Sequence, residues 1–119
     1  MASKYGRNAW TVQEAANSEA YYDYKQQNVT INETDISGAG DETADWTNNP
    51  AKEFTITKVS GDNADTVSFQ LKISGSYGDT ITYLLSEFPV TIDKLQVEQI
   101  KFATSNTSTD EVVKILSFH

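Results

Sequence analysis

The 119-residue sequence contains no cysteine and a single histidine, His119, at its last position. Thiol chemistry and Cys/His zinc sites are therefore excluded, and a Ser-His-Asp triad could draw only on that terminal residue. Basic residues are also scarce, because 9 Lys and Arg stand against 17 Asp and Glu, which gives a net charge of −8. Since phosphate binding needs a basic surface, we expect no nucleic-acid partner.

Long hydrophobic runs are missing as well. No stretch of about 18 apolar residues and no apolar leader with a small-residue cleavage site occurs, so the chain as given is expected neither to span a membrane nor to carry a signal. A native segment upstream of Met1 could have been removed. The sequence nevertheless has 5 Phe, 2 Trp and 6 Tyr, too many aromatic residues for a disordered polymer. A single folded domain over residues 1–119 is expected.

Two helices are predicted from local signals. The first runs from Thr11 to about Gln27: residues 11–14, Thr-Val-Gln-Glu, have the spacing of a capping box, and small or apolar residues recur every four positions. The second begins at Asp79, a candidate N-cap, and ends before Pro89. Its apolar face has the spacing i, i+3, i+4, i+7 and consists of Ile81, Leu84, Leu85 and Phe88.

Alternation of apolar and polar residues predicts strands in much of the remaining chain. The clearest strand spans residues 66–74, with every apolar side chain on one face. Other strands are expected at 28–36, at 54–59, at 90–102 with a bend or bulge, and at 111–118. Between residues 37 and 52 turn residues and acids replace this periodicity, which predicts a long acidic surface loop.

The elements repeat in the order helix, strand, loop, strand, over two halves of about 11–75 and 76–119. Each half enters a strand through the same tripeptide, Val-Thr-Ile, at Val29 and at Val90. Two such αββ halves commonly combine so that each covers the other's exposed strand face. We therefore predict an α+β fold, a permuted ferredoxin-like αββαββ sandwich with a four-stranded antiparallel sheet and two helices on one face.

The second half carries a family resemblance. An alternating strand ends at Gly75-Ser76-Tyr77, the predicted helix ends with residues 83–89, Tyr-Leu-Leu-Ser-Glu-Phe-Pro, and a strand over 92–97 follows. In this pattern the segment 66–118 resembles the periplasmic domain of PilO-type type IV pilus assembly proteins and the related M component of type II secretion. The resemblance implies a non-enzymatic scaffold without a cofactor. Such a domain lies on the periplasmic or extracellular face of the membrane, anchored in a longer native chain, and forms homodimers or heterodimers with a homologous pilus or secretion domain.

Aromatic and β-branched side chains are the candidates for contact with a partner: Trp10, Tyr21, Tyr22, Tyr24, Val29 and Ile31. The aromatic ones, together with Trp46, could instead form a sugar-stacking platform. This supports an alternative function, a β-rich structural or carbohydrate-contacting module of a virion or cell surface. An all-β fold favours this alternative, whereas two helices favour the scaffold.

No catalytic, cofactor-binding or metal-binding residue is assigned, and we expect the protein not to be an enzyme. Asp93 and Glu98 could act as paired carboxylates in glycoside hydrolysis, but nothing in the sequence places them in a cleft. Eight acids lie between Glu33 and Asp65, yet they lack the alternating ligands and central glycine of an EF-hand loop. Whether the acidic loop binds calcium stays open. His119 is interpreted as a terminal residue or a tag remnant.

Overall fold

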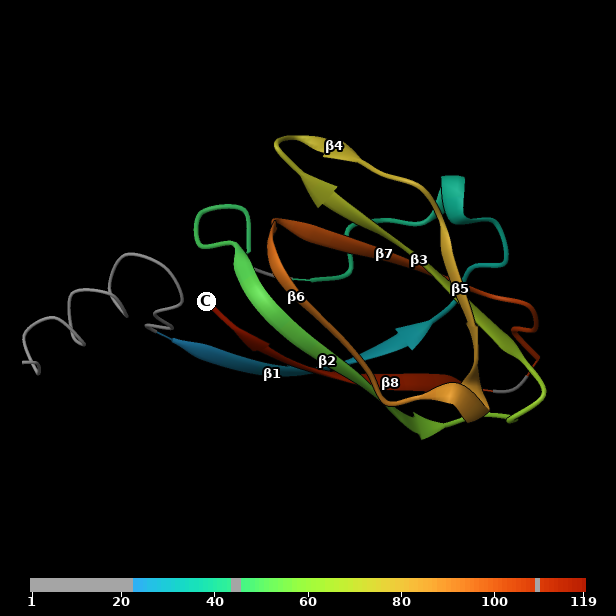
Figure 1. Cartoon of the computed structure of the whole chain (residues 1–119). Coiled ribbons are helices and arrows are strands. Elements are labelled where there is room, and N and C mark those ends of the chain that lie inside the picture. Colours follow the sequence, from blue (N-terminus) through green and yellow to red (C-terminus); the bar gives the residue numbers. More distant parts are fainter. Residues whose placement is uncertain (1–22, 44–45, 109) are drawn as a thin grey trace, which may run out of the picture.

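The computed structural model describes residues 23–43, 46–108 and 110–119. These residues form two antiparallel β-sheets packed face to face, joined by turns and by two short 3₁₀ helices (Figure 1). The 3₁₀ helices are η2 (Ile36–Gly38) and η3 (Leu85–Glu87). Within the described ranges, no helix is long and apolar enough to cross a membrane.

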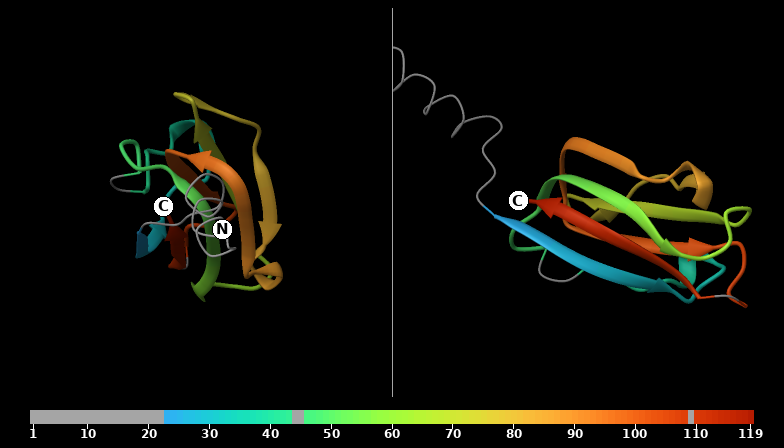
Figure 2. Two further views of the ribbon diagram at one scale, coloured as in Figure 1. Left: turned by 60° about the vertical axis from the view of Figure 1, so that its left-hand side comes forward. Right: turned by 90° about the horizontal axis from the view of Figure 1, so that it is seen from below.

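The first sheet has the strand order β1-β8-β2-β6. Its strands are β1 (Tyr24–Ile31), β8 (Glu111–Phe118), β2 (Ala51–Ser60) and β6 (Val90–Val97). Figure 2 shows them side by side, with β1 as the outermost strand on one side and β6 on the other. The pairing of β1 with β8 is continuous, whereas the register of β2 with β6 shifts between Ala51 and Glu53.

The second sheet is centred on β3 (Thr66–Ile73). One edge of β3 pairs with β7 (Gln99–Thr104), and the other pairs with β5 (Ile81–Leu84) and with the two-residue β4 (Ser76–Tyr77). The alternation predicted for residues 66–74 is confirmed, because Val67, Phe69 and Leu71 are buried. A strand with one apolar face needs a second layer to cover it, and the first sheet provides that layer.

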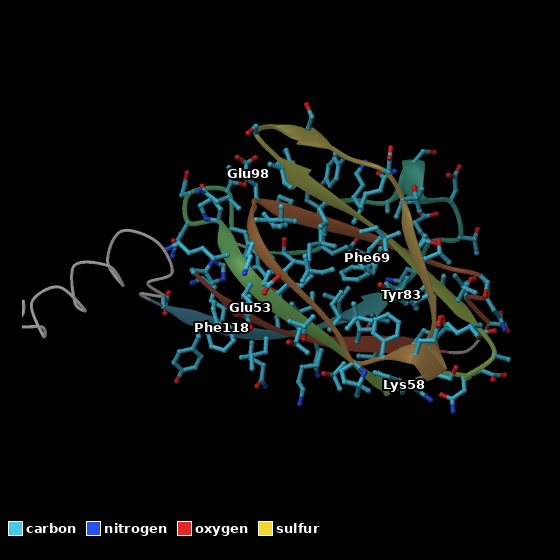
Figure 3. The ribbon with its side chains drawn as sticks, in the orientation of Figure 1. Glu53, Lys58, Phe69, Tyr83, Glu98 and Phe118 are labelled. Carbon is cyan, nitrogen blue, oxygen red and sulfur yellow. The ribbon has the colours of Figure 1, made fainter. Side chains whose placement is uncertain are left out.

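The hydrophobic core lies between the two sheets. Phe69 stacks on Tyr83 with ring centroids 6.2 Å apart, and Phe102 lies 6.1 Å from Phe69. Figure 3 shows Phe69 and Tyr83 close together between the layers. The first sheet contributes Val29, Ile31, Phe54, Ile56, Val97, Val113 and Ile115 to the same core.

The helix predicted at residues 79–88 is wrong. Ile81–Leu84 forms strand β5, and a single 3₁₀ turn follows it. Over so short a segment, the apolar spacing fits an alternating strand as well as a helix, since Tyr83 is partly buried and Thr82 is exposed. Pairing with β3 decides between the two, and the Ser68 and Thr82 hydroxyl oxygens, 2.9 Å apart, extend this pairing to the side chains.

The first predicted helix, residues 11–27, falls mostly outside the described residues, but its last four residues, 24–27, belong to strand β1. Each of them pairs with the apolar strand β8, and this tertiary contact outweighs local helix propensity. The predicted α+β fold, a permuted ferredoxin-like αββαββ sandwich, is therefore wrong, and the described chain is a β-sandwich. The two Val-Thr-Ile segments are not equivalent halves, because they lie in β1 and β6 at opposite edges of one sheet.

The bend predicted within residues 90–102 is confirmed. The first change of parity falls at Lys94, which lies within β6 and has a φ of 60°. The second falls at Glu98, where the chain leaves the first sheet and enters β7 of the second. The strand predicted at 111–118 is likewise confirmed and lies inside the first sheet, between β1 and β2.

Candidate functional site

The predicted partner-contact residues fall into three groups. Trp10, Tyr21 and Tyr22 lie outside the described residues. Tyr24 is 70% exposed at the start of β1. Val29 and Ile31 are 5% and 3% exposed, so their side chains belong to the core and are not offered to a partner. What these positions share is strand β1 itself, whose backbone is the better candidate for contact.

Among the residues that the structure describes, no strand pairs with the outer backbone edge of β1. Asp23 and His119 exchange both backbone hydrogen bonds, of 3.2 and 2.8 Å, which fixes the phase of the antiparallel ladder between β1 and β8. Bonded and non-bonded pairs alternate along such a ladder, so the odd-numbered residues of β1 bond to β8. The even-numbered residues therefore direct their N–H and C=O groups away from β8, and their side chains are exposed: Tyr24, Gln26, Asn28 and Thr30.

The other described sheet edges are protected. β6 carries Lys94 at positive φ and a register shift against β2. β7 is covered along its outer edge, because the N–H of Glu42 bonds to the C=O of Ile100 at 2.9 Å and the N–H of Thr104 bonds to the C=O of Glu33 at 2.8 Å. β4 and β5 are only two and four residues long. Bulges, covering loops and short strands are the usual means of preventing edge-to-edge pairing.

Within residues 23–43, 46–108 and 110–119, strand β1 has none of these protections. It is eight residues long and continuous in register, and it contains neither proline nor glycine. Its single charged residue is Lys25, whose Nζ lies 3.5 Å from an Asp23 carboxylate oxygen. Among the described strands, β1 thus presents the one edge that is long, regular and nearly uncharged. Such an edge is a template for adding a further strand.

A buried histidine cluster lies at the end of β8. The Nδ1 of His119 is 2.5 Å from the backbone oxygen of Asn49, and its Nε2 is 2.7 Å from the hydroxyl of Ser117. Because the carbonyl can only accept, Nδ1 carries the proton and donates it. The ring also meets the edge of Trp46, with centroids 5.2 Å apart. The sequence suggested only a terminal residue or a tag remnant for His119, whereas in the structure its side chain is 1% exposed and packs against Trp46.

The histidine cluster has the features of a structural contact and lacks those of a catalytic site. Ser117 and His119 are each 1% exposed, so no substrate reaches the hydroxyl in this state. The partner of Nδ1 is a backbone carbonyl, where a hydrolytic triad would place a carboxylate. Trp46, 0% exposed, is equally unavailable to stack on a sugar. Of the predicted aromatic platform, the described residues therefore leave Tyr24 alone on the surface.

A second buried polar cluster lies at the beginning of β8. Glu111 is fully buried, and one of its carboxyl oxygens accepts a hydrogen bond from the Thr104 hydroxyl. Its other oxygen has no hydrogen-bond partner in the described part of the chain, and neither does one buried oxygen of Asp65. Burial first, then the proximity of the Asp65 carboxyl, and finally the charge of Asp62 raise the pKa of Glu111 to about 7. The Thr104 hydrogen bond acts in the opposite direction.

The acidic residues considered for chemistry do not converge. In residues 23–43, 46–108 and 110–119, no three histidine or acidic side chains are grouped so that they could hold a metal ion. Glu98 accepts a hydrogen bond of 3.1 Å from the N–H of Gly75, which ties it to the turn between β3 and β4. Asp93 lies exposed on β6. In Glu42, burial and the nearby charge of Asp41 raise the pKa of the carboxyl.

Two features of the site were missed by sequence reasoning, and one of them had a signal. Glu111 shares its parity with Val113 and Ile115, so an acid on the apolar face of a predicted strand marked a buried carboxyl. His119 gave no such signal, because its partner Asn49 lies 70 residues away in the chain.

No family model and no curated protein matches this chain. By its fold, the described part of the chain is an antiparallel β-sandwich, and one edge among its described strands is unprotected.

Proposed function

We propose that this chain is a non-enzymatic β-sandwich module with a structural, protein-binding role in an assembly on a virion or cell surface. The observation that carries the proposal is the β-sandwich formed by the described residues, combined with the open edge of β1. Both described polar clusters at the ends of β8 are inside the protein, where they hold strands together. What remains for contact with a partner protein is the outward-facing backbone N–H and C=O groups of β1.

The pilus and secretion scaffold is the weaker reading of the same chain. Its resemblance depended on a helix between Tyr77 and Pro89, and this segment forms a strand and a 3₁₀ turn instead. The idea of a non-enzymatic domain that binds itself or a partner does not depend on that helix and is kept.

Protein contact is favoured over carbohydrate contact. A sugar-binding surface needs aromatic rings whose faces are accessible. Trp46 is buried against Phe54 and His119, and Tyr24 stands without another described member of the predicted platform beside it.

Activity and glycan-binding assays on the purified full chain test the proposal. We expect no turnover of chromogenic glycosides or esters above that of two control variants, the double variant Asp93→Asn/Glu98→Gln and the single variant Ser117→Ala. Turnover that either variant abolishes would overturn the proposal. In affinity electrophoresis, we expect that gels containing polysaccharide do not retard the chain. Retardation that Tyr24→Ala removes would replace protein contact with carbohydrate contact.

A further inference from the structure

We propose that strand β1 pairs antiparallel with β1 of a second copy of this chain, about a two-fold axis at Gln27. The inference deepens the proposed function by naming the partner, and it rests on that function being one of assembly. It joins the two four-stranded sheets into one continuous sheet across the dimer.

The choice of a second copy follows from the edges. The other described edges are shortened, covered or distorted, so a second copy also offers β1 as its open edge. Two identical edges that meet form an isologous contact, which closes after two chains. A β1–β1 pair is therefore the simplest way in which both open edges are satisfied at once.

The register follows from the phase of the ladder. Only the even-numbered residues of β1 direct N–H and C=O groups outward, so they must face even-numbered residues of the second copy. A two-fold axis at Gln27 places Tyr24 opposite Thr30 and Gln26 opposite Asn28. This register uses residues 24–30 of both strands. Because the N–H of Tyr24 already donates to an Asp23 carboxylate oxygen at 2.8 Å, about six backbone hydrogen bonds form across the pair.

The side chains of β1 are complementary in this register. Gln26 and Asn28 are exposed on the same face, and each amide both donates and accepts, so the two can bond across the strands. The net charge of −8 opposes self-association in general. In β1, however, the single charged residue, Lys25, falls opposite Val29, so no like charges meet.

Sedimentation velocity over a concentration series tests the pairing. We expect the mass of the full chain to rise toward twice that of one chain. Asn28→Lys adds charge at the edge, and Asn28→Pro removes an N–H that faces outward and leaves the bonds to β8 in place. Each should weaken dimerisation at least tenfold, with folding checked by circular dichroism. Gln96→Lys, exposed on the opposite edge strand β6, is the matched control and should dimerise as the unmodified chain does.

A cysteine cross-link tests the register itself. Gln27 meets its own copy at a non-bonded position, where the Cα atoms come within the range that a disulfide needs. Because the chain has no cysteine, Gln27→Cys should give one covalent dimer on mild oxidation, whereas Gln96→Cys should form no covalent dimer.

A chain that is monomeric at all concentrations, or a dimer that survives Asn28→Pro and is lost in Gln96→Lys, overturns the edge pairing. Equal cross-linking of the two cysteine variants overturns it as well. These outcomes are independent of the enzyme assays, so the edge pairing and the proposed function can fail separately. If the chain is a monomer and shows no turnover, the proposal of a non-enzymatic binding module stands, but the proposal that its partner is a second copy fails.

Discussion

A buried titratable side chain lies at each end of strand β8, and the two differ in how many of their polar atoms have hydrogen-bond partners. Directly after the last residue of β8, both ring nitrogens of His119 have partners within 2.7 Å. At the first position, Glu111 has one oxygen bonded to Thr104 and the other unpartnered within the described residues. The two ends therefore have different effects on stability, although both side chains are equally hidden from solvent.

The contrast arises from the neighbours. His119 is surrounded by neutral dipoles and by the ring of Trp46, so its position stabilises the fold at little electrostatic cost. Glu111 faces Asp65 and Asp62, and the described structure assigns it no cation. A buried carboxyl group beside other acids is stable only in its protonated form. The stability of the Glu111 end of β8 therefore depends on pH.

The largest expected effect is that of Gly61→Ala at the Glu111 end. Gly61 has a φ of +128°, and an added Cβ would come within 2.8 Å of the Glu111 Cγ and 2.9 Å of the Leu85 Cδ1. Steric crowding and backbone strain together should lower the free energy of unfolding by about 2–4 kcal/mol. Urea denaturation measures the loss.

Gly75→Ala is the control for this prediction. Gly75 also has positive φ, at +83°, but a Cβ there would meet no atom within 4 Å. It should cost about 1–2 kcal/mol from the backbone alone. Equal losses for the two alanine variants would contradict the idea that the Glu111 end is tightly packed.

At the other end, His119→Ala should lower the free energy of unfolding by about 2–3 kcal/mol. The substitution leaves the Ser117 hydroxyl and the Asn49 carbonyl without their partner and removes the ring that contacts Trp46. His119→Phe keeps a ring against Trp46 and should lose less. A change below about 0.5 kcal/mol in the alanine variant, measured by thermal or urea unfolding, would show that this end does not hold β8.

The smallest and most specific effect is the pH dependence due to Glu111. Its pKa is about 7 in the folded chain, against an ordinary value of 4.5, so the folded state binds more protons between these values. The free energy of unfolding should therefore fall as pH rises through this window. Part of the shift is offset by relaxation and by solvent, which leaves a fall of about 1–2 kcal/mol.

Glu111→Gln should remove this fall, because the amide does not ionise. The variant should be more stable than the unmodified chain at pH 8 and should differ least from it at pH 4. Urea unfolding at both values gives the slope, and an unchanged slope in the variant would assign the pH dependence to other groups.

The sequence predicted strands best where one face is buried and the other exposed. Residues 66–74 alternate without interruption, and the parity changes near Lys94 and Glu98 marked a bend and a change of sheet. The segment 79–88 failed because few apolar residues can satisfy two periods at once, and pairing with β3 chose the strand. Local sequence contains no information about that pairing.

The candidate site was harder to predict than the fold. A strand is recognised from its own residues, but an open edge exists only relative to the strands and loops around it. Tyr24, Val29 and Ile31 were singled out as side chains, whereas the strand that contains them is of interest for its backbone. His119 was dismissed because its partners Ser117, Asn49 and Trp46 meet it only after folding.

By itself, the amino-acid order determined which chemistries are missing and which segments alternate, because composition and side-chain period are properties of the residues themselves. Tertiary structure alone decided that Ile81–Leu84 is extended, that His119 is buried at the end of β8, and that β1 lies at an edge. These properties depend on contacts between residues far apart in the chain. Their energies appear only when the two sheets close over a common core.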